Sequence, residues 1–330
     1  MKKRFLTLGA IFLLLLSVLS GCKSNDNQAK VIKFADVGWD SIKFHNAVAM
    51  LVAEKAYGYK TDEVSATTPI TTQALISGDM DVLMEMWTDN VSTYEKDIST
   101  GKYALMGTNF ADNKQGFYVP RYVIEGDAKR NIKASAPDLK TVADLAKYKS
   151  VFVDDEDKSR GRIYGAISGW DIDVVMNNKY KFYGLDKDFN YFRPGSNAAL
   201  DAAFTSAYEK GEPIVGYYWE PTWLTGKYDM VLLEDAPYDV TIYKAGKCAC
   251  PSVNVTICTS NKTLEKAPDF VEFLKKYQTS SVLTAEALAY MSDNKANYVD
   301  TAKWFLKNHD DLLIKWLPTA KADLVRKAIK

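Results

Sequence analysis

The chain has 330 residues, and its 42 Lys and Arg residues balance its 42 Asp and Glu residues. This balance gives no basic surface for nucleic acid and no acidic excess of the kind that keeps a chain disordered. Residues 22–330 are enough for two domains of the usual size, about 100 to 200 residues each. We therefore expect a folded chain with no nucleic acid among its partners.

The N-terminus has the pattern of an export signal. Basic residues at 2–4 precede a Leu-rich run over 5–19, and the chain becomes polar directly after Cys22. Because this run is shorter than the roughly 20 apolar residues that span a membrane, a cleaved signal peptide over 1–21 is favoured over an uncleaved anchor. The Leu-Ser-Gly-Cys sequence ending at Cys22 resembles a bacterial lipobox, which implies lipidation of this thiol. We expect a polar tether over 22–30 and a fold outside the cytoplasm.

The first predicted unit is a strand followed by a helix, with a tryptophan at their junction. The apolar sequence over 31–35 predicts a short strand, and Gly38 ends it. Apolar residues then take up helical spacing over 42–56. Trp39 is therefore expected at a strand-to-helix turn.

The next unit places another tryptophan after a strand. A Thr-Thr-Pro sequence at 67–69 predicts a helix start, and Gly78 is typical of a helix end. A strand over 81–86 then leads into Trp87.

The second half of the chain repeats this order. A Pro-Gly-Ser-Asn sequence ending at Asn197 predicts the cap of an Ala-rich helix over 198–210, which Gly211 ends. A strand over 213–218 then leads into Trp219. The repetition predicts two similarly built α/β lobes. In open α/β sheets ligands lie outside the carboxyl ends of the strands, which is where these tryptophans fall.

The last part of the chain is predicted to be helical after one more strand. β-Branched residues over 252–257 predict this strand, and apolar residues recur at helical spacing over 268–277, 282–291 and 299–306. No Gly-rich and Ser-rich linker divides the chain. Two lobes would therefore be joined by crossing segments, and the C-terminal part would return to the first lobe.

Three cysteines, Cys248, Cys250 and Cys258, lie close together near this strand. The first two would lie on the same face of a strand, and no Cys-x-x-Cys sequence or His partner is near, which argues against a metal site. We interpret all three as small core residues, with a disulfide from Cys258 to Cys250 or Cys248 as the alternative.

The residues that catalysis needs are scarce. His45 falls within the apolar pattern of the first helix and His309 lies in a polar turn, so neither is placed as a general base. The chain has no nucleophile elbow, phosphate-binding loop, dinucleotide fingerprint or zinc-protease motif. The acidic run at 154–157 lacks the ligand spacing of an EF-hand and is interpreted as a solvated turn. We expect no enzyme, no cofactor and no metal.

The remaining candidates for chemistry are aromatic rings next to polar turns. A quaternary ammonium has no N–H to donate, so a protein holds it with ring faces, each worth about 0.5 to 2 kcal/mol. We predict that the tryptophans at strand ends or Gly-marked turns form such a site: Trp39, Trp87, Trp170 and Trp219. Tyr118 and its neighbour Phe117 are further candidates. Three other tryptophans are expected in the core: Trp223, Trp304 and Trp316.

Several segments carry a family resemblance: Gly-Trp-Asp-Ser at 38–41, Glu-Met-Trp at 85–87, Phe-Tyr-Val-Pro at 117–120, the loop at 165–170 and Trp-Glu-Pro at 219–221. Together with the lipobox they resemble the substrate-binding proteins of glycine betaine, choline and proline betaine ABC importers. The similarity follows the same order along nearly the whole mature chain, which makes it more specific than any one motif.

This resemblance implies an α/β periplasmic-binding-protein fold of type II, in which two lobes close on the ligand as a hinged clamp. One lobe would comprise residues 31–120 and 238–330, and the other residues 121–237. The resemblance implies an aromatic cage made by Trp39, Trp87, Trp219, Tyr118 or Phe117, and Trp170, with Asp40 and Ser41 as polar companions. The implied protein is a lipid-anchored monomer that faces outside the cytoplasm at the cell membrane and delivers a quaternary amine to an ABC permease.

Three positions depart from the family pattern. Thr222 stands where some betaine-binding members have a His that helps to hold the carboxylate. Choline-binding members have an acidic residue two positions after the first tryptophan, where this chain has Ser41. They also have an Asn where this chain has Trp170, which favours betaines over choline as the ligand.

Two other classes of protein remain open. An amino-acid receptor, the nearer rival, would need an Arg for the ligand carboxylate, for which Arg121, Arg160 or Arg162 is available. A carbohydrate-active surface protein would need paired carboxylates, for which Glu85 and Glu220 are the candidates.

Overall fold

The structure, a computed structural model, describes residues 30–330, in which Val31–Lys330 form one compact unit. The predicted signal peptide over 1–21 and the lipidation site Cys22 lie outside the described residues, as does nearly all of the predicted tether. Within the described part of the chain, no helix is both long enough and apolar enough to cross a membrane.

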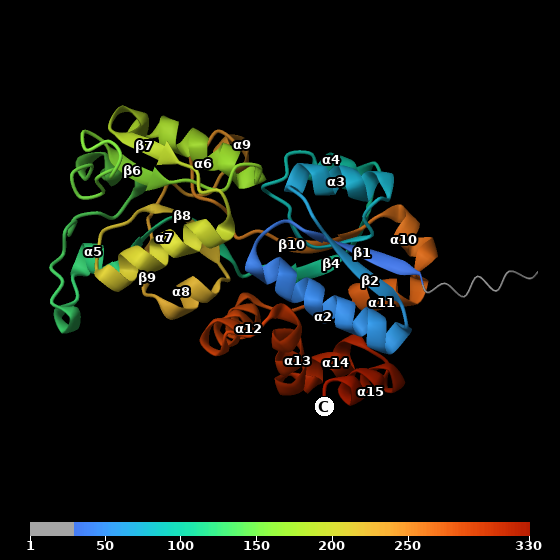
Figure 1. Cartoon of the computed structure of the whole chain (residues 1–330). Coiled ribbons are helices and arrows are strands. Elements are labelled where there is room, and N and C mark those ends of the chain that lie inside the picture. The colour runs from blue at the N-terminus through green and yellow to red at the C-terminus, as the bar shows by residue number, and fades with distance from the viewer. Residues whose placement is uncertain (1–29) are drawn as a thin grey trace, which may run out of the picture. The chain divides into compact units, whose positions relative to one another are not determined.

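Two five-stranded sheets form the framework of this unit (Figure 1). The first sheet has, in spatial order, β2 (Lys60–Ser65), β1 (Val31–Asp36), β3 (Val82–Trp87), β10 (Val255–Thr259) and β4 (Ala104–Phe110). The second sheet has β7 (Phe189–Phe192), β6 (Gly161–Tyr164), β8 (Gly216–Glu220), β5 (Lys114–Pro120) and β9 (Met230–Leu232).

Both sheets have the same arrangement of strands. β1 lies between β2 and β3 and is parallel to both, while β10 is antiparallel to β3 and β4. β6 lies in the same way between β7 and β8, and β5 is antiparallel to β8 and β9. The prediction of two similarly built α/β lobes is confirmed.

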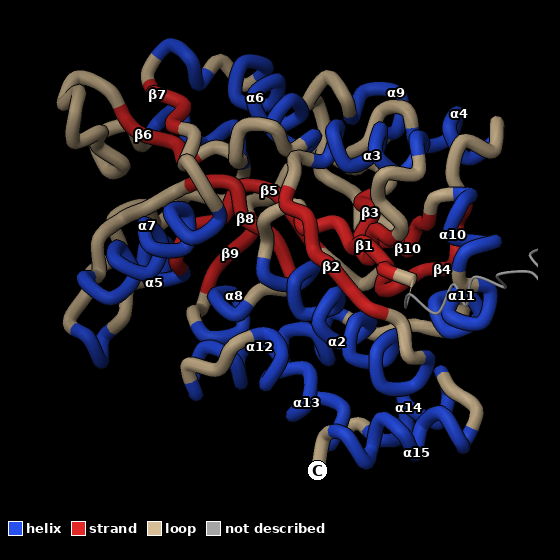
Figure 2. Tube along the Cα trace, turned by 45° about the vertical axis from the view of Figure 1, so that its right-hand side comes forward, coloured by secondary structure: helices blue, strands red, loops and turns tan. Residues whose placement is uncertain are grey.

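Helices lie on both sides of each sheet (Figure 2). The first lobe has α2 (Asp40–Tyr57), α3 (Thr68–Ser77), α4 (Tyr94–Ser99), α10 (Asn261–Lys266) and α11 (Pro268–Leu274). The second lobe has α5 (Arg121–Glu125), α6 (Asp171–Phe182), α7 (Asn197–Lys210), α8 (Trp223–Lys227) and α9 (Val240–Tyr243), with short 3-10 turns at Ala128–Arg130, Val142–Lys147 and Leu185–Lys187. As predicted, α3 and α7 end at Gly78 and Gly211, whose φ angles of 76° and 74° favour glycine.

Four further helices complete the chain: α12 (Ser281–Asn294), α13 (Tyr298–Asn308), α14 (Asp310–Trp316) and α15 (Thr319–Ala328). α13 and α15 pack against α2 of the first lobe, whereas α12 packs against both α2 and α8 of the second lobe. The C-terminal helices therefore contact both lobes on the side of α2 (Figures 1 and 2).

The chain crosses between the sheets twice, from β4 to β5 and from β9 to β10. β5 lies in the second sheet, which is earlier in the chain than the predicted boundary after residue 120. The returning segment still contacts the second lobe beyond residue 238, because Asn178 of α6 donates to the backbone oxygen of Lys244 at 2.9 Å. The ammonium group of Lys244 in turn donates to the backbone oxygen of Asn90 in the first lobe at 2.9 Å.

The three cysteines are free, so the alternative of a disulfide is excluded in this structure. Cys258 lies in β10, whereas Cys248 and Cys250 lie in the preceding segment outside any strand, so the prediction that they share a strand face is wrong. Cys248 and Cys258 are fully buried, as expected of small core residues, and burial raises the pKa of Cys258 to about 12.

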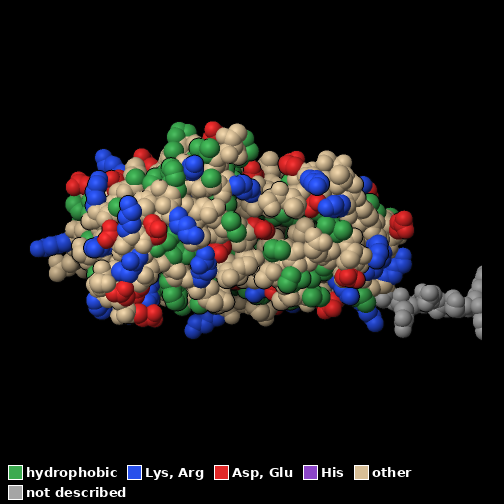
Figure 3. Space-filling model, turned by 90° about the horizontal axis from the view of Figure 1, so that it is seen from above, with side chains coloured by type: hydrophobic (Ala, Val, Ile, Leu, Met, Phe, Trp, Pro, Cys, Tyr) green, Lys and Arg blue, Asp and Glu red, His purple; other side chains and the backbone are tan. Residues whose placement is uncertain are grey.

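Charged side chains of both signs are interspersed over the face shown in Figure 3, with no broad area of one sign. This distribution agrees with the balanced composition of the chain.

Two tryptophans of the C-terminal helices differ in how deeply they are buried. Trp316 is 2% exposed and stacks on Tyr277 with ring centroids 4.5 Å apart. Trp304 is only partly buried and stacks on Tyr290 at 4.1 Å, so the prediction of a core position is confirmed for Trp316 alone of these two.

We expect Trp316→Ala to lower the free energy of unfolding by about 3 to 5 kcal/mol, because it removes a large buried side chain and leaves a cavity. Trp304→Ala is the matched control, and a smaller loss is expected because this ring is already partly in water. Chemical denaturation of both variants measures the difference, and equal losses would contradict this assignment of the core.

Candidate ligand-binding site

Four tryptophans from the two lobes surround one pocket. Trp39 and Trp170 are the N-cap residues of α2 and α6, where extended backbone turns into a helix. Trp87 is the last residue of β3, and Trp219 lies one residue before the end of β8. Since β1 and β3 occupy the same places in the first sheet as β6 and β8 in the second, each lobe contributes one ring from a strand-to-helix junction and one from a strand end.

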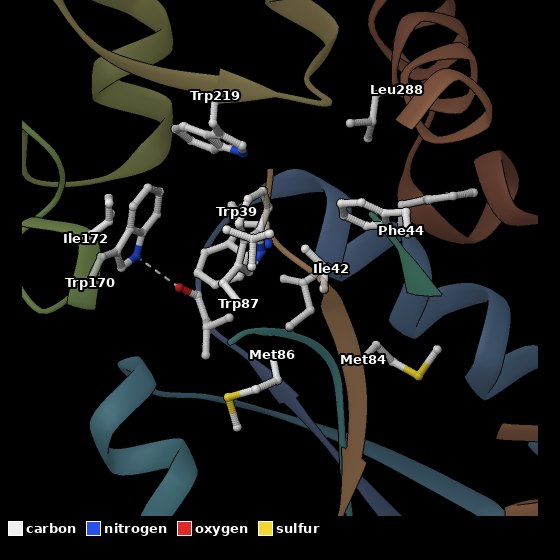
Figure 4. Close-up of a cluster of buried hydrophobic side chains, with 14 of the residues drawn as sticks. Trp39, Ile42, Phe44, Met84, Met86, Trp87, Trp170, Ile172, Trp219 and Leu288 are labelled. Carbon is white, nitrogen blue, oxygen red and sulfur yellow. Dashed lines mark hydrogen bonds between the residues drawn. The ribbon is translucent and has the colours of Figure 1, made fainter. Parts of the chain in front are cut away.

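Three of these rings, Trp39, Trp170 and Trp219, meet edge to face between the lobes (Figure 4). The ring centroids of Trp170 lie 5.2 Å from those of both Trp39 and Trp219, with interplanar angles of 87° and 84°. The indole nitrogen of Trp170 donates to the backbone oxygen of Val37 at 3.2 Å, which is the dashed line in Figure 4. The second lobe is thereby bonded to the turn between β1 and α2 of the first lobe.

The pocket contains about 390 Å³ of empty space, including the part open to solvent. Its other lining residues are Thr68, Asn90, Val91, Asp171, Ile172 and Tyr217. Tyr217 adds a fifth aromatic ring, stacked on Trp219 with centroids 5.7 Å apart. The sequence analysis missed Tyr217, although its position two residues before Trp219 places both side chains on one face of a strand.

Glu85 accepts hydrogen bonds from both tryptophans that the first lobe contributes to the pocket. Its Oε2 atom accepts hydrogen bonds from the indole nitrogens of Trp39 at 2.6 Å and Trp87 at 3.1 Å, and from the hydroxyl of Ser41 at 3.1 Å. The side chain is fully buried, and desolvation raises its pKa to about 7, although the three hydrogen bonds favour the carboxylate. The partners of Oε2 are therefore two indoles of the pocket and the hydroxyl of Ser41, and the carbohydrate hypothesis did not predict them.

His45 lies beside the other oxygen of this carboxylate, with 3.6 Å between its Nε2 and Oε1 of Glu85. Burial lowers the pKa of His45 to about 3, so the ring is neutral near pH 7 and the contact is not an ion pair. The Nδ1 atom of the ring lies 2.8 Å from the hydroxyl of Tyr277, and Nε2 lies 3.3 Å from that of Thr284. His45 thus has the core position that the apolar helical pattern predicted.

The start of α6 brings polar groups to the same pocket. The backbone N–H groups of Asp171 and Ile172, the first two residues of α6, have no hydrogen-bond acceptor within residues 30–330. The N-terminal end of a helix favours negative charge. The side chain of Asp171 also lines the pocket, where its Oδ2 atom has no partner among the described residues and desolvation raises its pKa. The pocket therefore has an aromatic part and a polar edge.

Asp40 and Ser41 lie beside the aromatic pocket and not in its wall. Both line a smaller space of about 190 Å³ that shares Trp219 with the aromatic pocket. Asp40 accepts a hydrogen bond from the hydroxyl of Tyr298 at 2.8 Å. Thr222 lines this smaller space too, and its hydroxyl oxygen caps α8 by accepting from the backbone N–H of residue 225 at 3.1 Å.

Tyr118 and Phe117, the other predicted cage residues, do not line the aromatic pocket. In β5, Tyr118 pairs with Gly216 of β8, which places its side chain on the face opposite to that of Tyr217 and Trp219. There its hydroxyl donates to Oε1 of Glu220 at 3.1 Å. A sequence motif does not reveal this register, because it depends on how two distant strands pair.

The groups that an amino-acid or sugar site would need are engaged elsewhere. Arg121 pairs with Asp229 at the surface, Arg160 donates to backbone oxygens of residues 186–189, and Arg162 bonds Asp154 at 2.5 Å. Asp154 is buried at this contact, so the prediction that it lies in a solvated turn is wrong. Neither these arginines nor Glu220 line the aromatic pocket.

Comparison with known sequences indicates a family of transport proteins. A family model described as the substrate binding domain of ABC-type glycine betaine transport system matches residues 30–308. The chain is 25% identical over 154 residues to the glycine betaine/carnitine transport binding protein GbuC of Listeria monocytogenes serotype 1/2a. That alignment covers 47% of this chain and 48% of the relative, so the chain spans about half the length of the curated relative it matches.

Three solved structures share the fold. The glycine betaine/L-proline-binding protein ProX from Borrelia burgdorferi has a TM-score of 0.71 at 21% identity, over 90% of this chain and 100% of that chain. An ABC-transporter choline binding protein in complex with choline has a TM-score of 0.69 at 21% identity, over 91% and 98%. Lactococcal OpuAC, closed on glycine betaine, has a TM-score of 0.68 at 19% identity, over 88% and 100%.

These structures confirm the two-lobed α/β periplasmic-binding-protein fold that the sequence motifs implied. The sequence match extends over both sheets, since it begins at residue 30 and ends at residue 308. The chain belongs to the family of substrate-binding domains of ABC-type glycine betaine transport systems.

Proposed function

We propose that the protein is an extracytoplasmic receptor of an ABC importer, which captures a quaternary-ammonium solute in the aromatic pocket and catalyses no reaction. The observation that carries this proposal is the meeting of four indoles, two from each lobe, around one pocket. Ring faces suit a cation that has no N–H to donate, and each contributes about 0.5 to 2 kcal/mol. Four rings then supply about 2 to 8 kcal/mol, and the upper end approaches the roughly 8 kcal/mol of a micromolar complex.

Capture involves the closing of the two lobes. Because the cage takes rings from both lobes, it is complete only when the lobes meet, so ligand binding and lobe closure stabilise each other. The bond from Trp170 to the backbone oxygen of Val37 supports this coupling, since it joins the cage ring of one lobe to the turn that carries Trp39 in the other.

The ligand is a small quaternary amine such as glycine betaine, proline betaine, choline or carnitine. The unpartnered N–H groups of Asp171 and Ile172 suit a carboxylate oxygen at the far end of a betaine. Trp170, in place of the Asn of choline-binding relatives, also favours betaines. The absence of the three candidate arginines from the pocket wall removes support from the amino-acid alternative.

The receptor is further proposed to be a monomer that docks onto a membrane permease and remains at the cell membrane through a lipid on Cys22. The export pattern of residues 1–21 and the Leu-Ser-Gly-Cys sequence support the anchor. Membership of a transport family supports the permease as a partner.

Titration calorimetry with glycine betaine, proline betaine, choline and carnitine tests the proposed ligand class. We expect binding heat and a change in tryptophan fluorescence with at least one of these amines, because its trimethylated or dimethylated nitrogen would contact the rings. Glucose and arginine are the controls, and neither is expected to bind. An absence of heat with every quaternary amine would refute the proposal.

We expect Trp219→Ala to weaken binding by at least about 1 kcal/mol, or roughly fivefold, because it removes one face of the cage. Two variants outside the pocket are the controls. Trp304→Ala removes a tryptophan of the C-terminal helices, and Tyr118→Phe changes a residue on the opposite face of the sheet that carries Trp219. Both variants are expected to keep the affinity of the wild-type protein. Unchanged affinity in Trp219→Ala would remove this residue from the site.

A further inference from the structure

Glu85 places a carboxylate directly behind the aromatic pocket. The residue is 1% exposed, and one of its oxygens accepts all three hydrogen bonds from Trp39, Trp87 and Ser41. Its other oxygen, Oε1, has no hydrogen-bond partner within residues 30–330. A neutral amide oxygen would accept from the same donors, so these bonds alone do not account for a buried carboxylate, which is costly to desolvate.

Among the described residues, no cation of the protein faces this carboxylate. The ionisable groups beside it are His45 of α2 and Tyr277, which follows α11. Burial lowers the pKa of His45 to about 3 and raises that of Tyr277 well above its usual value, so both are neutral near pH 7. Within residues 30–330, no positively charged side chain therefore balances the negative charge of Glu85.

We propose that Glu85 is the counter-charge of the bound quaternary ammonium, acting through the indole rings of Trp39 and Trp87 that lie between the two charges. This inference rests on the proposed function. Each indole donates its N–H to the carboxylate, which increases the electron density of the ring face that contacts the cation. The two charges also attract each other strongly because buried groups, and not water, lie between them. Glu85 thus positions two rings and selects a charged trimethylammonium group over a neutral group of the same shape.

This attraction depends on pH, because burial raises the pKa of Glu85 to about 7. Below this pKa the side chain is neutral and the attraction is lost, whereas above it the carboxylate is charged and the cation binds more tightly. By linkage, cation binding lowers the pKa of Glu85 by the same factor by which deprotonation of Glu85 raises the affinity. A decrease of about one pKa unit corresponds to about tenfold tighter binding on the alkaline side.

Calorimetric titrations of the wild-type protein between about pH 5.5 and 8.5 test this prediction. The probes are glycine betaine, choline and their carbon isosteres, in which a tert-butyl group replaces the trimethylammonium group. We expect the affinity for the cations to rise about tenfold with pH, and the affinity for the isosteres to be lower and to lack this rise. Each isostere keeps the far end of its parent ligand, so any pH effect of Asp171 on that far end is the same for both members of a pair. The same pH profile for cation and isostere would overturn the proposal.

The substitution Glu85→Gln keeps an oxygen acceptor for the indoles and removes the charge. At alkaline pH we expect about tenfold weaker binding of the cations, a flat pH profile and unchanged affinity for the isosteres. Ser41→Ala is the matched control, because it removes one of the three donors and keeps the charge, so the affinity should still rise with pH, with its midpoint moved to higher pH. A pH-dependent affinity in Glu85→Gln equal to that of the wild type would overturn the proposal. Thermal unfolding shows whether Glu85→Gln folds. If this variant does not fold, the pH profiles of cation and isostere binding to the wild-type protein test the proposal.

Failure of the proposed function and failure of this inference give different results. If the wild-type protein binds neither the cations nor their isosteres, the receptor function is refuted. If it binds the cations with an affinity that does not change with pH, the receptor function stands and the role of Glu85 is refuted.

Discussion

The pocket depends on burying several indoles together without leaving their N–H groups unpaired, because a buried donor without an acceptor is costly. One oxygen of Glu85 accepts from Trp39 and Trp87, and the backbone oxygen of Val37 accepts from Trp170. Glu85 and Trp87 are two residues apart in β3, so both side chains lie on the same face of that strand. The first sheet thereby supplies a ring and the acceptor that orients it, and the helix start at Trp39 brings a second ring to the same acceptor.

The two lobes repeat one arrangement of strands, but their aromatic side chains donate to different kinds of acceptor. In the first lobe the ring edges meet a buried carboxylate. In the second lobe Tyr217 donates to Oε1 of Gln115 at 3.2 Å, and the amides of Gln115 and Asn90 face each other at 3.3 Å. Asn90 belongs to the first lobe, so this polar network also lies between the lobes. The shared topology places the rings, and the local side chains decide the charge behind them.

Much of the fold follows from local patterns in the sequence, whereas much of the site does not. Gly78 and Gly211 mark helix ends because a left-handed φ angle is a local requirement. Three of the four tryptophans, Trp39, Trp87 and Trp219, follow strands that local apolar runs predict. β2 escaped prediction because most of its side chains are polar and exposed. Tyr118 lies outside the aromatic pocket, because the direction of its side chain depends on pairing with a strand about a hundred residues away. The contact from Trp39 to Glu85 joins residues 46 positions apart, and no spacing rule reveals such a partner.

The bond between Trp170 and Val37, together with the contact of α12 with α8, joins the lobes through the protein's own groups. In the proposed receptor, each of these contacts stabilises the arrangement in which the lobes meet, whether or not a ligand is bound. A fraction of the ligand-free molecules then has the conformation of ligand-bound ones. In the proposed importer, these ligand-free molecules compete for the permease without delivering a solute. The strength of these two contacts therefore sets a compromise between rapid capture of scarce solute and wasted transport cycles.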